Sequence, residues 1–481
     1  MFNPNNLVIT GGHFVSNSRS QHKYGELKIG RFVESFLNVT CFLDADLKEL
    51  FRNIVVDAFH NSSTSYDLAK CYPGTREAVM KDLCDWVKNN DREHPIYHLY
   101  APAGSGKTAI ARTLADTFSV GDDQNSQKHL LAAFFFSRTV ESRNNARHFI
   151  TTIAYQIAIN IPSASHFVCE AIDQDPSLLS RDLMFQMHVL ILNPLRRACE
   201  SASEDEKAAW PKLIVLDGLD ECSGKDAQAN ILDAVSELAN CRPLPIAIFL
   251  SCRPEIHIRT AFQTGALKDL SQKICLSNNY DTEDDIRFFL VSSFKSIREA
   301  HSGICQIPPS WPDPATIESL VHKASGHFVF ASVVINYVKV LDDNPIKRLE
   351  IVCGLAECND EKPFAQLDAL YSHILDSIKS THRDIVAAVF SCILARSEVP
   401  TALLNPILVL DQVRMKYGLA SLVGILVDYF GYEQRYVKFL HASFSDFLSD
   451  KDRSGKHYIA QNQAHATVSI HLLDHLRNRR T

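Results

Sequence analysis

The chain has 481 residues, with 49 Lys and Arg against 56 Asp and Glu, so its formal net charge is −7, and 46% of its residues are hydrophobic. This composition is typical of globular proteins and excludes disorder along the whole chain. The length is sufficient for about three domains, each with its own core. Because the chain is mildly acidic and has no long basic block, we expect no nucleic-acid partner.

Neither a transmembrane segment nor a secretory leader is indicated. No run of about 18 apolar residues occurs, because the most apolar stretches, 385–395 and 419–427, are interrupted by Ser, Cys and Gly. The N-terminus lacks the basic and apolar regions of a signal peptide. The 13 Cys residues are scattered without a C-x-x-C pair, which is typical of reduced thiols. We therefore expect a cytoplasmic protein.

The N-terminal segment, residues 1–70, is predicted to be partly disordered, with one helix around the apolar spacing of 47–55. From about residue 71, apolar strands alternate with amphipathic helices, which predicts an α/β fold with a parallel sheet covered on both faces. The five predicted strands lie at 96–100, 131–136, 213–216, 246–250 and 273–276. After residue 279 the pattern becomes helical, with a short β-rich piece at 436–440.

The strongest motif is the sequence APAGSGKT at 101–108, which follows a predicted strand and precedes a predicted helix. In this context it predicts a P-loop, whose backbone N–H groups and helix N-terminus bind phosphate. Lys107 is expected to reach the β- and γ-phosphates, and the Thr108 hydroxyl to bind Mg²⁺. The expected phosphate-binding residues of this loop are Ala103, Gly104, Ser105, Gly106, Lys107, Thr108 and Ala109.

A second motif is the acidic sequence DGLDE at 217–221, directly after the predicted strand 213–216. Asp217 at the strand tip is expected to bind Mg²⁺. Asp220 and Glu221, on the following turn, are the candidate catalytic residues, because a carboxylate there can orient or deprotonate an attacking water. Helix capping by these two acids is the structural alternative.

Two arginines follow predicted strands. Arg253 comes after the strand at 246–250, and the carboxyl edge of an open α/β sheet is where nucleotides bind, so we expect it to contact a γ-phosphate. A surface ion pair with Glu255 is the alternative. Arg138, after the second strand, is predicted to contact a phosphate or another domain, or to form a plain surface ion pair.

Together the P-loop, DGLDE and the RPE segment at 253–255 resemble the NACHT family of STAND P-loop NTPases. Phrases typical of the fungal, NLR-like and basidiomycete-type branch of this family are AFHNS at 58–62, CYPGTR at 71–76, FFFSR at 134–138 and TIAYQ at 152–156. The resemblance covers roughly residues 58–450. It implies a five-stranded parallel P-loop NTPase sheet of the ASCE/AAA-like type, followed by an α-helical lid domain and a winged-helix domain.

The resemblance also implies boundaries: an N-terminal segment 1–70, a NACHT nucleotide-binding domain 71–279, a helical domain 280–379, a winged-helix domain 380–450 and a C-terminal helical tail 451–481. Phe328 stands where the family usually has Pro. The resemblance therefore implies only that Phe328 lies near the base of the nucleotide, and packing in a helical core is the alternative. His441 matches the family histidine that contacts the β-phosphate in the diphosphate-bound state. Ser443, with Asp446, is expected to be the N-cap of the next helix.

The implied function is a nucleotide-dependent signalling switch. It would bind ATP or GTP with Mg²⁺, hydrolyse it slowly to ADP or GDP, and thereby control self-association and signalling, as in fungal non-self recognition, innate immunity or programmed cell death. Its partners would be nucleotide, further copies of the chain and an unknown effector or sensor protein. The sequence ends at Thr481, whereas relatives usually continue into C-terminal repeats, so the sensor is expected to be missing or on another chain.

Two other functions remain open at the level of sequence. One is an interaction scaffold that binds nucleotide tightly without hydrolysing it. The other is a P-loop small-molecule kinase, although DGLDE suits a water nucleophile better than a phosphate acceptor.

Overall fold

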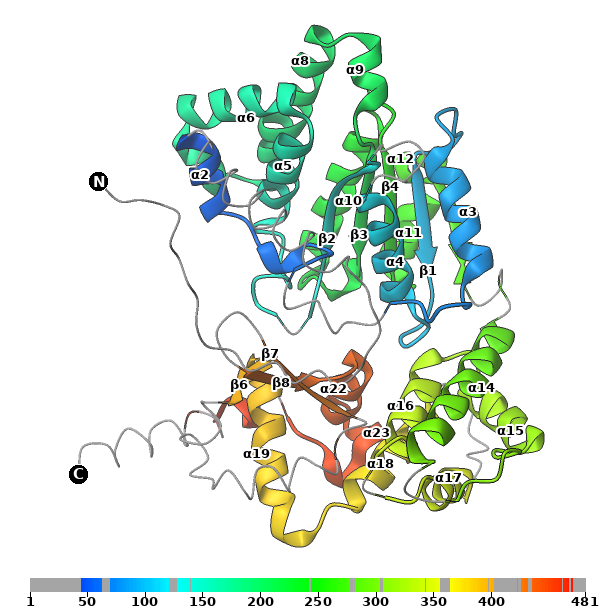
Figure 1. The fold of residues 1–481 in the computed structure, drawn as a ribbon. Helices are drawn as coiled ribbons and strands as arrows, with labels where there is room; N and C mark the ends of the chain where they lie inside the picture. The colour runs from blue at the N-terminus through cyan, green and yellow to red at the C-terminus, as the bar shows by residue number, and fades with distance from the viewer. Residues whose placement is uncertain are drawn as a thin grey trace, which may run out of the picture. The chain divides into compact units, whose positions relative to one another are not determined.

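Figure 1 shows the fold of the chain in a computed structural model. It describes the following residues: 45–62, 70–120, 128–138, 140–241, 244–276, 280, 282–302, 306–341, 343–354, 364–396, 398–401, 422, 425–430, 435–460, 462–466 and 469. Contacts divide the chain into two units, Met1–Glu49 and Leu50–Thr481. Residues 1–44, in which disorder is predicted, lie outside the described residues.

The helix predicted from the apolar spacing of 47–55 ends earlier than that spacing indicates. Helix α2 spans Ala45–Arg52, and the 3-10 turn η1 spans Val56–Ala58. The side chain of Leu50 is fully buried.

A five-stranded, all-parallel sheet forms the centre of the first half of the unit Leu50–Thr481, with strand order β2-β3-β4-β1-β5. Its strands are β1 (Ile96–Tyr100), β2 (Leu130–Phe135), β3 (Leu213–Asp217), β4 (Ala247–Cys252) and β5 (Ser271–Cys275). The prediction of a five-stranded parallel sheet is therefore confirmed. β2, β3 and β4 are buried along their whole length, as expected for apolar strands with helices on both faces.

The helices of this half cover the two faces of the sheet. Alternate strand residues pack with α3 (Glu77–Lys88) and α4 (Lys107–Ser119) in one apolar cluster. Against other strand residues lie α5 (Phe149–Asn160), which contacts β2, and α10 (Lys225–Ala239), which contacts β4. The remaining helices here are α11 (Ile256–Gln263) and α12 (Ala266–Leu270).

Between α5 and β3 the chain forms a helical insertion that sequence analysis did not predict. Its elements are α6 (Pro162–Gln174), η3 (Pro176–Ser180), α7 (Leu183–Gln186), the π-helix η4 (Met187–Leu192), α8 (Asn193–Ser201) and α9 (Glu204–Ala209). After α6, which has 13 residues, the pieces are short, and the π-helical turn η4 interrupts the 3.6-residue period on which a helix prediction depends.

The second half is helical and ends in a small antiparallel sheet. Its helices are α14 (Thr282–His301), α15 (Pro314–Ala324), α16 (Phe328–Val338), α17 (Pro345–Gly354), α18 (Ala365–Asp376), α19 (Ser380–Arg396), α22 (Ala442–Ser449) and α23 (Lys451–Ser454), followed by the 3-10 turn η6 (Gly455–His457). The sheet has the order β6-β8-β7, from β6 (Glu398–Pro400), β8 (Arg435–Phe439) and β7 (Leu426–Phe430). One apolar cluster, the C-terminal core, runs from Ile286 to Leu448. Residues 402–421 of the expected winged-helix domain and 470–481 of the expected C-terminal tail lie outside the described residues.

The expected N-cap of α22 is wrong by two residues. His441, in an extended conformation, is the N-cap residue, and it makes no capping bond through its side chain. Ser443 lies within the first turn of α22, and its hydroxyl forms a 3.0 Å hydrogen bond with the hydroxyl of buried Tyr371. None of the described helices combines the length and the apolar character that a bilayer span needs.

The C-terminal core predicts a large effect for Phe444→Ala. Phe444 is 1% exposed and its ring centroid lies 4.8–5.4 Å from those of Tyr371, Phe390 and Phe439. Truncation leaves a cavity and should lower the free energy of unfolding by about 3–5 kcal/mol. Denaturant unfolding measures this free energy. Phe288→Ala is the control, because the Phe288 side chain is 47% exposed. Equal losses for both variants would contradict this packing.

Candidate functional site

The predicted site residues meet at one cavity of about 310 Å³. It lies beyond the carboxyl ends of β3 and β4 and includes residues of α14, α16 and the start of α22. The predicted residues that line it are Ala103, Gly104, Gly106, Lys107, Thr108, Ala109, Asp217, Asp220, Glu221, Arg253 and His441. Ser105 is the one predicted residue that is not among the lining residues.

The P-loop joins β1 to α4 and is held by its own side chains. Gly104 and Gly106 both have positive φ, at +74° and +94°, which L side chains rarely adopt. The Lys107 ammonium donates to the carbonyls of Ala101 and Pro102 at 2.8 and 2.9 Å. The Ser105 hydroxyl also donates to the Pro102 carbonyl, at 2.9 Å, so this side chain shapes the loop.

The outer side of the P-loop contacts the segment that leads into α16. The ring of His327 donates from Nδ1 to the Ala103 carbonyl at 3.0 Å, and the Val329 N–H donates to the Gly104 carbonyl at 3.1 Å. A Cβ on Gly104 would lie 2.4 Å from Val329 Cγ1. The carbonyls of Ala103 and Gly104 are therefore bound by donors outside the loop, and the loop N–H groups are the part of its backbone that can bind an anion.

Arg76 supports the loop from a third direction and was not singled out in sequence analysis. Its side chain is 3% exposed, and its guanidinium donates to the Ser105 carbonyl at 2.9 Å and to the Thr282 hydroxyl at 3.0 Å. It also lies 4.8 Å from the Phe328 ring centroid and 3.6 Å from Asp285. Such a buried arginine depends on partners about 30 and 200 residues away, so no local pattern indicates it.

The cavity has an aromatic end. Phe289 lies between Tyr72 and Phe328, with ring centroids 5.2 and 6.0 Å away, and all three line the cavity. Phe328 is therefore at the cavity, as expected for a residue near the base, and it also packs against the C-terminal core, as its alternative predicted. Flat apolar side chains of this kind suit a planar base.

Asp217 and Thr108 form a pair that fits Mg²⁺. Asp217 accepts hydrogen bonds from the hydroxyls of Thr108 and Ser251, and burial raises the pKa of its carboxyl group. Mg²⁺ needs few protein ligands, because water and phosphate oxygens complete its octahedral shell. One carboxylate and one hydroxyl at the P-loop are the ligands used in P-loop NTPases.

The two candidate catalytic carboxylates have different environments. Buried Asp220 accepts from the Arg253 backbone N–H at 2.8 Å, and its second oxygen lies 3.1 Å from Arg253 Nε. Glu221 accepts from the Arg138 N–H at 3.0 Å, and burial, with the charge of Asp220, raises its pKa to about 7. Neither side chain caps the 3-10 turn η5 (Leu219–Glu221) that carries them. Glu221 is therefore the better candidate for a base near neutral pH.

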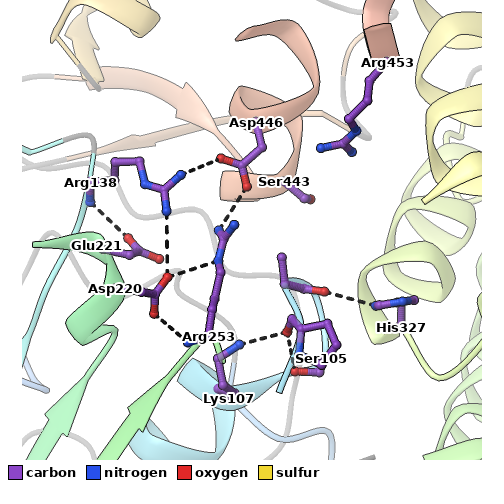
Figure 2. A network of polar contacts seen from close by, with 12 residues as sticks. Ser105, Lys107, Arg138, Asp220, Glu221, Arg253, His327, Ser443, Asp446 and Arg453 are labelled. Atoms are coloured by element: carbon purple, nitrogen blue, oxygen red, sulfur yellow. Dashed lines mark hydrogen bonds and ion pairs between the residues drawn. The ribbon is translucent and has the colours of Figure 1, made fainter. Parts of the chain in front are cut away.

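Arg253 and Arg138 also contact α22 (Figure 2). Arg253 Nη2 lies 3.0 Å from Asp446 Oδ2, and Arg138 Nη1 lies 3.2 Å from Asp446 Oδ1. Arg253 is thus paired with Asp220 and Asp446, and its predicted alternative partner Glu255 lies instead near His257, at 3.8 Å. Of the roles predicted for Arg138, the described contacts match the one between distant parts of the chain.

His441 directly precedes α22 as its N-cap residue and lines the cavity. Its Nε2 lies 3.3 Å from the Ser332 hydroxyl of α16. Burial lowers the pKa of His441 to about 4, so the imidazole is neutral at pH 7. A neutral imidazole still has one N–H to donate to a phosphate oxygen.

Strand order, P-loop geometry and the Asp217–Thr108 pair together define a P-loop NTPase-like, nucleotide-binding domain. The family model of nephrocystin 3, N-terminal, matches residues 74–253, which contain the P-loop, DGLDE and Arg253. No curated protein matches the chain.

Solved structures give distant likenesses. The Drosophila ORC bound to DNA matches with a TM-score of 0.37 and 14% identity, over 80% of this chain and 97% of that chain. The Aeropyrum pernix ORC2 protein, in ADPNP and ADP complexes, matches with a TM-score of 0.35 and 10% identity, over 86% and 98%. The first of these structures is bound to DNA. For the present chain, the expectation that it binds no nucleic acid stays a prediction.

The close contact at the P-loop predicts that Gly104→Ala is harmful. The methyl group would force a positive φ on alanine and push against Val329, at a cost of about 1–3 kcal/mol. We expect a lower thermal unfolding midpoint and weaker binding of a fluorescent nucleotide. Gly354→Ala is the matched control, because nothing lies within 4 Å of its Cβ position. Equal behaviour of the two variants would contradict the described loop geometry.

Proposed function

We propose that the chain is a nucleotide-dependent switch of the NACHT, NLR-like class that binds ATP or GTP with Mg²⁺ and hydrolyses it slowly. The observation that carries the proposal is the single cavity lined by the P-loop, the acidic turn, Arg253, α16 and His441. A ligand that contacts residues so far apart in the chain can favour one arrangement of them over another by differential affinity.

The residues of the site divide the chemistry between them. The loop N–H groups and Lys107 bind the phosphates, and Asp217 and Thr108 hold Mg²⁺, which neutralises charge on the phosphate oxygens. Lys107 would exchange two neutral carbonyl partners for charged phosphate oxygens, which form stronger hydrogen bonds. Glu221 would orient water and take its proton.

The proposal also covers the diphosphate-bound state and its exchange for the triphosphate-bound state. The elements from β6 to α22 would act as a winged-helix domain, whose His441 donates to the β-phosphate of a bound diphosphate. Exchange for a triphosphate would release this contact, allow self-association and pass a signal to an effector. Fungal non-self recognition or programmed cell death is the setting that the NACHT resemblance supports.

The first test is the nucleotide content and turnover of the purified chain. We expect bound ADP or GDP by chromatography, slow phosphate release, and at least a tenfold loss of nucleotide affinity in Lys107→Ala, because the ammonium no longer offsets phosphate charge. Lys207→Ala, whose ammonium pairs with Glu204 outside the cavity, is the matched control.

Each other outcome of this test has a defined meaning. Bound nucleotide without turnover would replace the switch with a non-hydrolysing scaffold. Phosphate found on a small acceptor rather than in water would favour a kinase. A protein that binds neither ATP nor GTP would overturn the proposal.

The raised pKa of Glu221 predicts the pH dependence of hydrolysis. A base works deprotonated, and with a pKa of about 7 the deprotonated fraction rises from about a tenth at pH 6 to about nine tenths at pH 8. Phosphate release at saturating nucleotide should therefore rise severalfold over this interval. Glu221→Gln should be slow and flat, whereas the exposed Glu350→Gln should follow the wild type. A flat wild-type profile would argue against Glu221 as the base.

A further inference from the structure

We propose that Arg138 and Arg253 form a two-guanidinium site for the terminal phosphate of a nucleoside triphosphate, and that the Asp446 carboxylate occupies this site in the present structure. Asp446 is then a competitor built into the chain, and it makes this form bind diphosphate in preference to triphosphate. The inference rests on the proposed function, because it concerns the same nucleotide site.

The contacts of Asp446 are those of a bridging anion. One oxygen lies 3.2 Å from Arg138 Nη1 and the other 3.0 Å from Arg253 Nη2, so each oxygen has its own guanidinium (Figure 2). Arginine forks bind carboxylate and phosphate oxygens by the same geometry. The side chains of Asp446 and Arg253 are only 19% and 23% exposed, so solvent screens their attraction less than at an open surface.

The charges within the ion pairs of the cluster are balanced. Two guanidinium groups, of Arg138 and Arg253, face two carboxylates, of Asp220 and Asp446. Asp220 is fixed by the backbone N–H of Arg253 as well as by its side chain, so Asp446 is the carboxylate that can leave. A terminal phosphate beside Asp446 would bring about two further negative charges to the same guanidinium groups, and like charges at this distance repel.

Arg253 connects this cluster to the cavity at the P-loop. Arg253 lines the cavity with Lys107, and its charge acts on the pKa of the Lys107 ammonium. Lys107 is the P-loop residue that reaches the β- and γ-phosphates. A diphosphate ends before this position and leaves Asp446 in place, whereas a triphosphate needs the position itself.

Release of Asp446 would act on a defined element. Asp446 belongs to α22, which starts after His441 at the cavity and carries Phe444 and Phe447 in the C-terminal core. Because one carboxylate ties this helix to residues that follow β2 and β4, exchanging it for a phosphate removes that tie. The third phosphate is thereby linked to the position of α22 without any other group having to titrate.

The test compares diphosphate and triphosphate affinity in Asp446→Asn. This substitution keeps the shape of the side chain and removes its charge. Calorimetry on the full chain, stripped of bound nucleotide, would use Mg²⁺ with ADP and AMP-PNP, and with GDP and GMP-PNP. We expect the affinity for the triphosphate analogue to rise about tenfold relative to the diphosphate, whose own affinity changes less than about twofold. Exposed Asp452→Asn is the matched control and should keep the wild-type ratio.

A second variant keeps the inference testable if Asp446→Asn does not fold. Arg138→Ala, at a side chain 44% exposed, should weaken binding of the triphosphate analogue severalfold and leave diphosphate binding unchanged. Its backbone N–H contact to Glu221 is retained. In the double variant, the gain of Asp446→Asn should be lost.

The outcomes separate the two proposals. A wild-type ratio in Asp446→Asn, or equal changes for both nucleotides, would overturn the role of Asp446 while nucleotide binding itself stands. Unchanged triphosphate binding in Arg138→Ala would likewise overturn the two-arginine site. Binding of neither nucleotide class by the wild type would overturn the proposed function and this inference with it.

Discussion

The site depends on the attachment of Arg253 to Asp220. The backbone N–H and the Nε of one residue bind the two oxygens of the other, which ties the end of β4 to the turn after β3. This pairing turns the free end of the Arg253 guanidinium toward α22 and leaves Glu221 to accept from the Arg138 backbone. The two neighbouring carboxylates thus have separate roles. Asp220 is paired with Arg253, whereas burial and the charge of Asp220 raise the pKa of Glu221.

A second constraint acts on the opposite side of the nucleotide site. The P-loop carbonyls of Ala103 and Gly104 are bound by the start of α16, and that of Ser105 is bound by Arg76, which also contacts Thr282 of α14. The start of α16 therefore contacts the P-loop directly and α14 contacts it through Arg76, while α22 contacts Arg138 and Arg253. Phosphates bound between these contacts would bear on both, which is the physical requirement for a nucleotide to control the arrangement of distant segments.

The sequence predicted the parts of this site that depend on local patterns. β2, β3 and β4 are largely apolar, fully buried runs, and the P-loop and DGLDE are short motifs whose chemistry follows from their place after a strand. Arg76, His327 and Asp446 have no such signal, because each acts through a partner more than 25 residues away. The helices after α6, up to residue 209, were missed because short turns and a π-helix break their periods. The cap at Ser443 was misplaced because the Ser443 hydroxyl forms a hydrogen bond with the Tyr371 hydroxyl instead.

The electrostatics of the cavity are those of a site built for a ligand that is itself highly charged. Burial lowers the pKa of Lys107 and raises those of Asp217 and Glu221, so each charged form is disfavoured where it stands. Groups buried in this way cost stability unless they are paired. Phosphate oxygens would stabilise the Lys107 ammonium, and Mg²⁺ would stabilise the Asp217 carboxylate. A magnesium nucleotide would therefore offset the unfavourable burial of both charges. Binding and stability would then be linked, because the ligand would add counter-charges to those that Lys107 and Asp217 supply to each other.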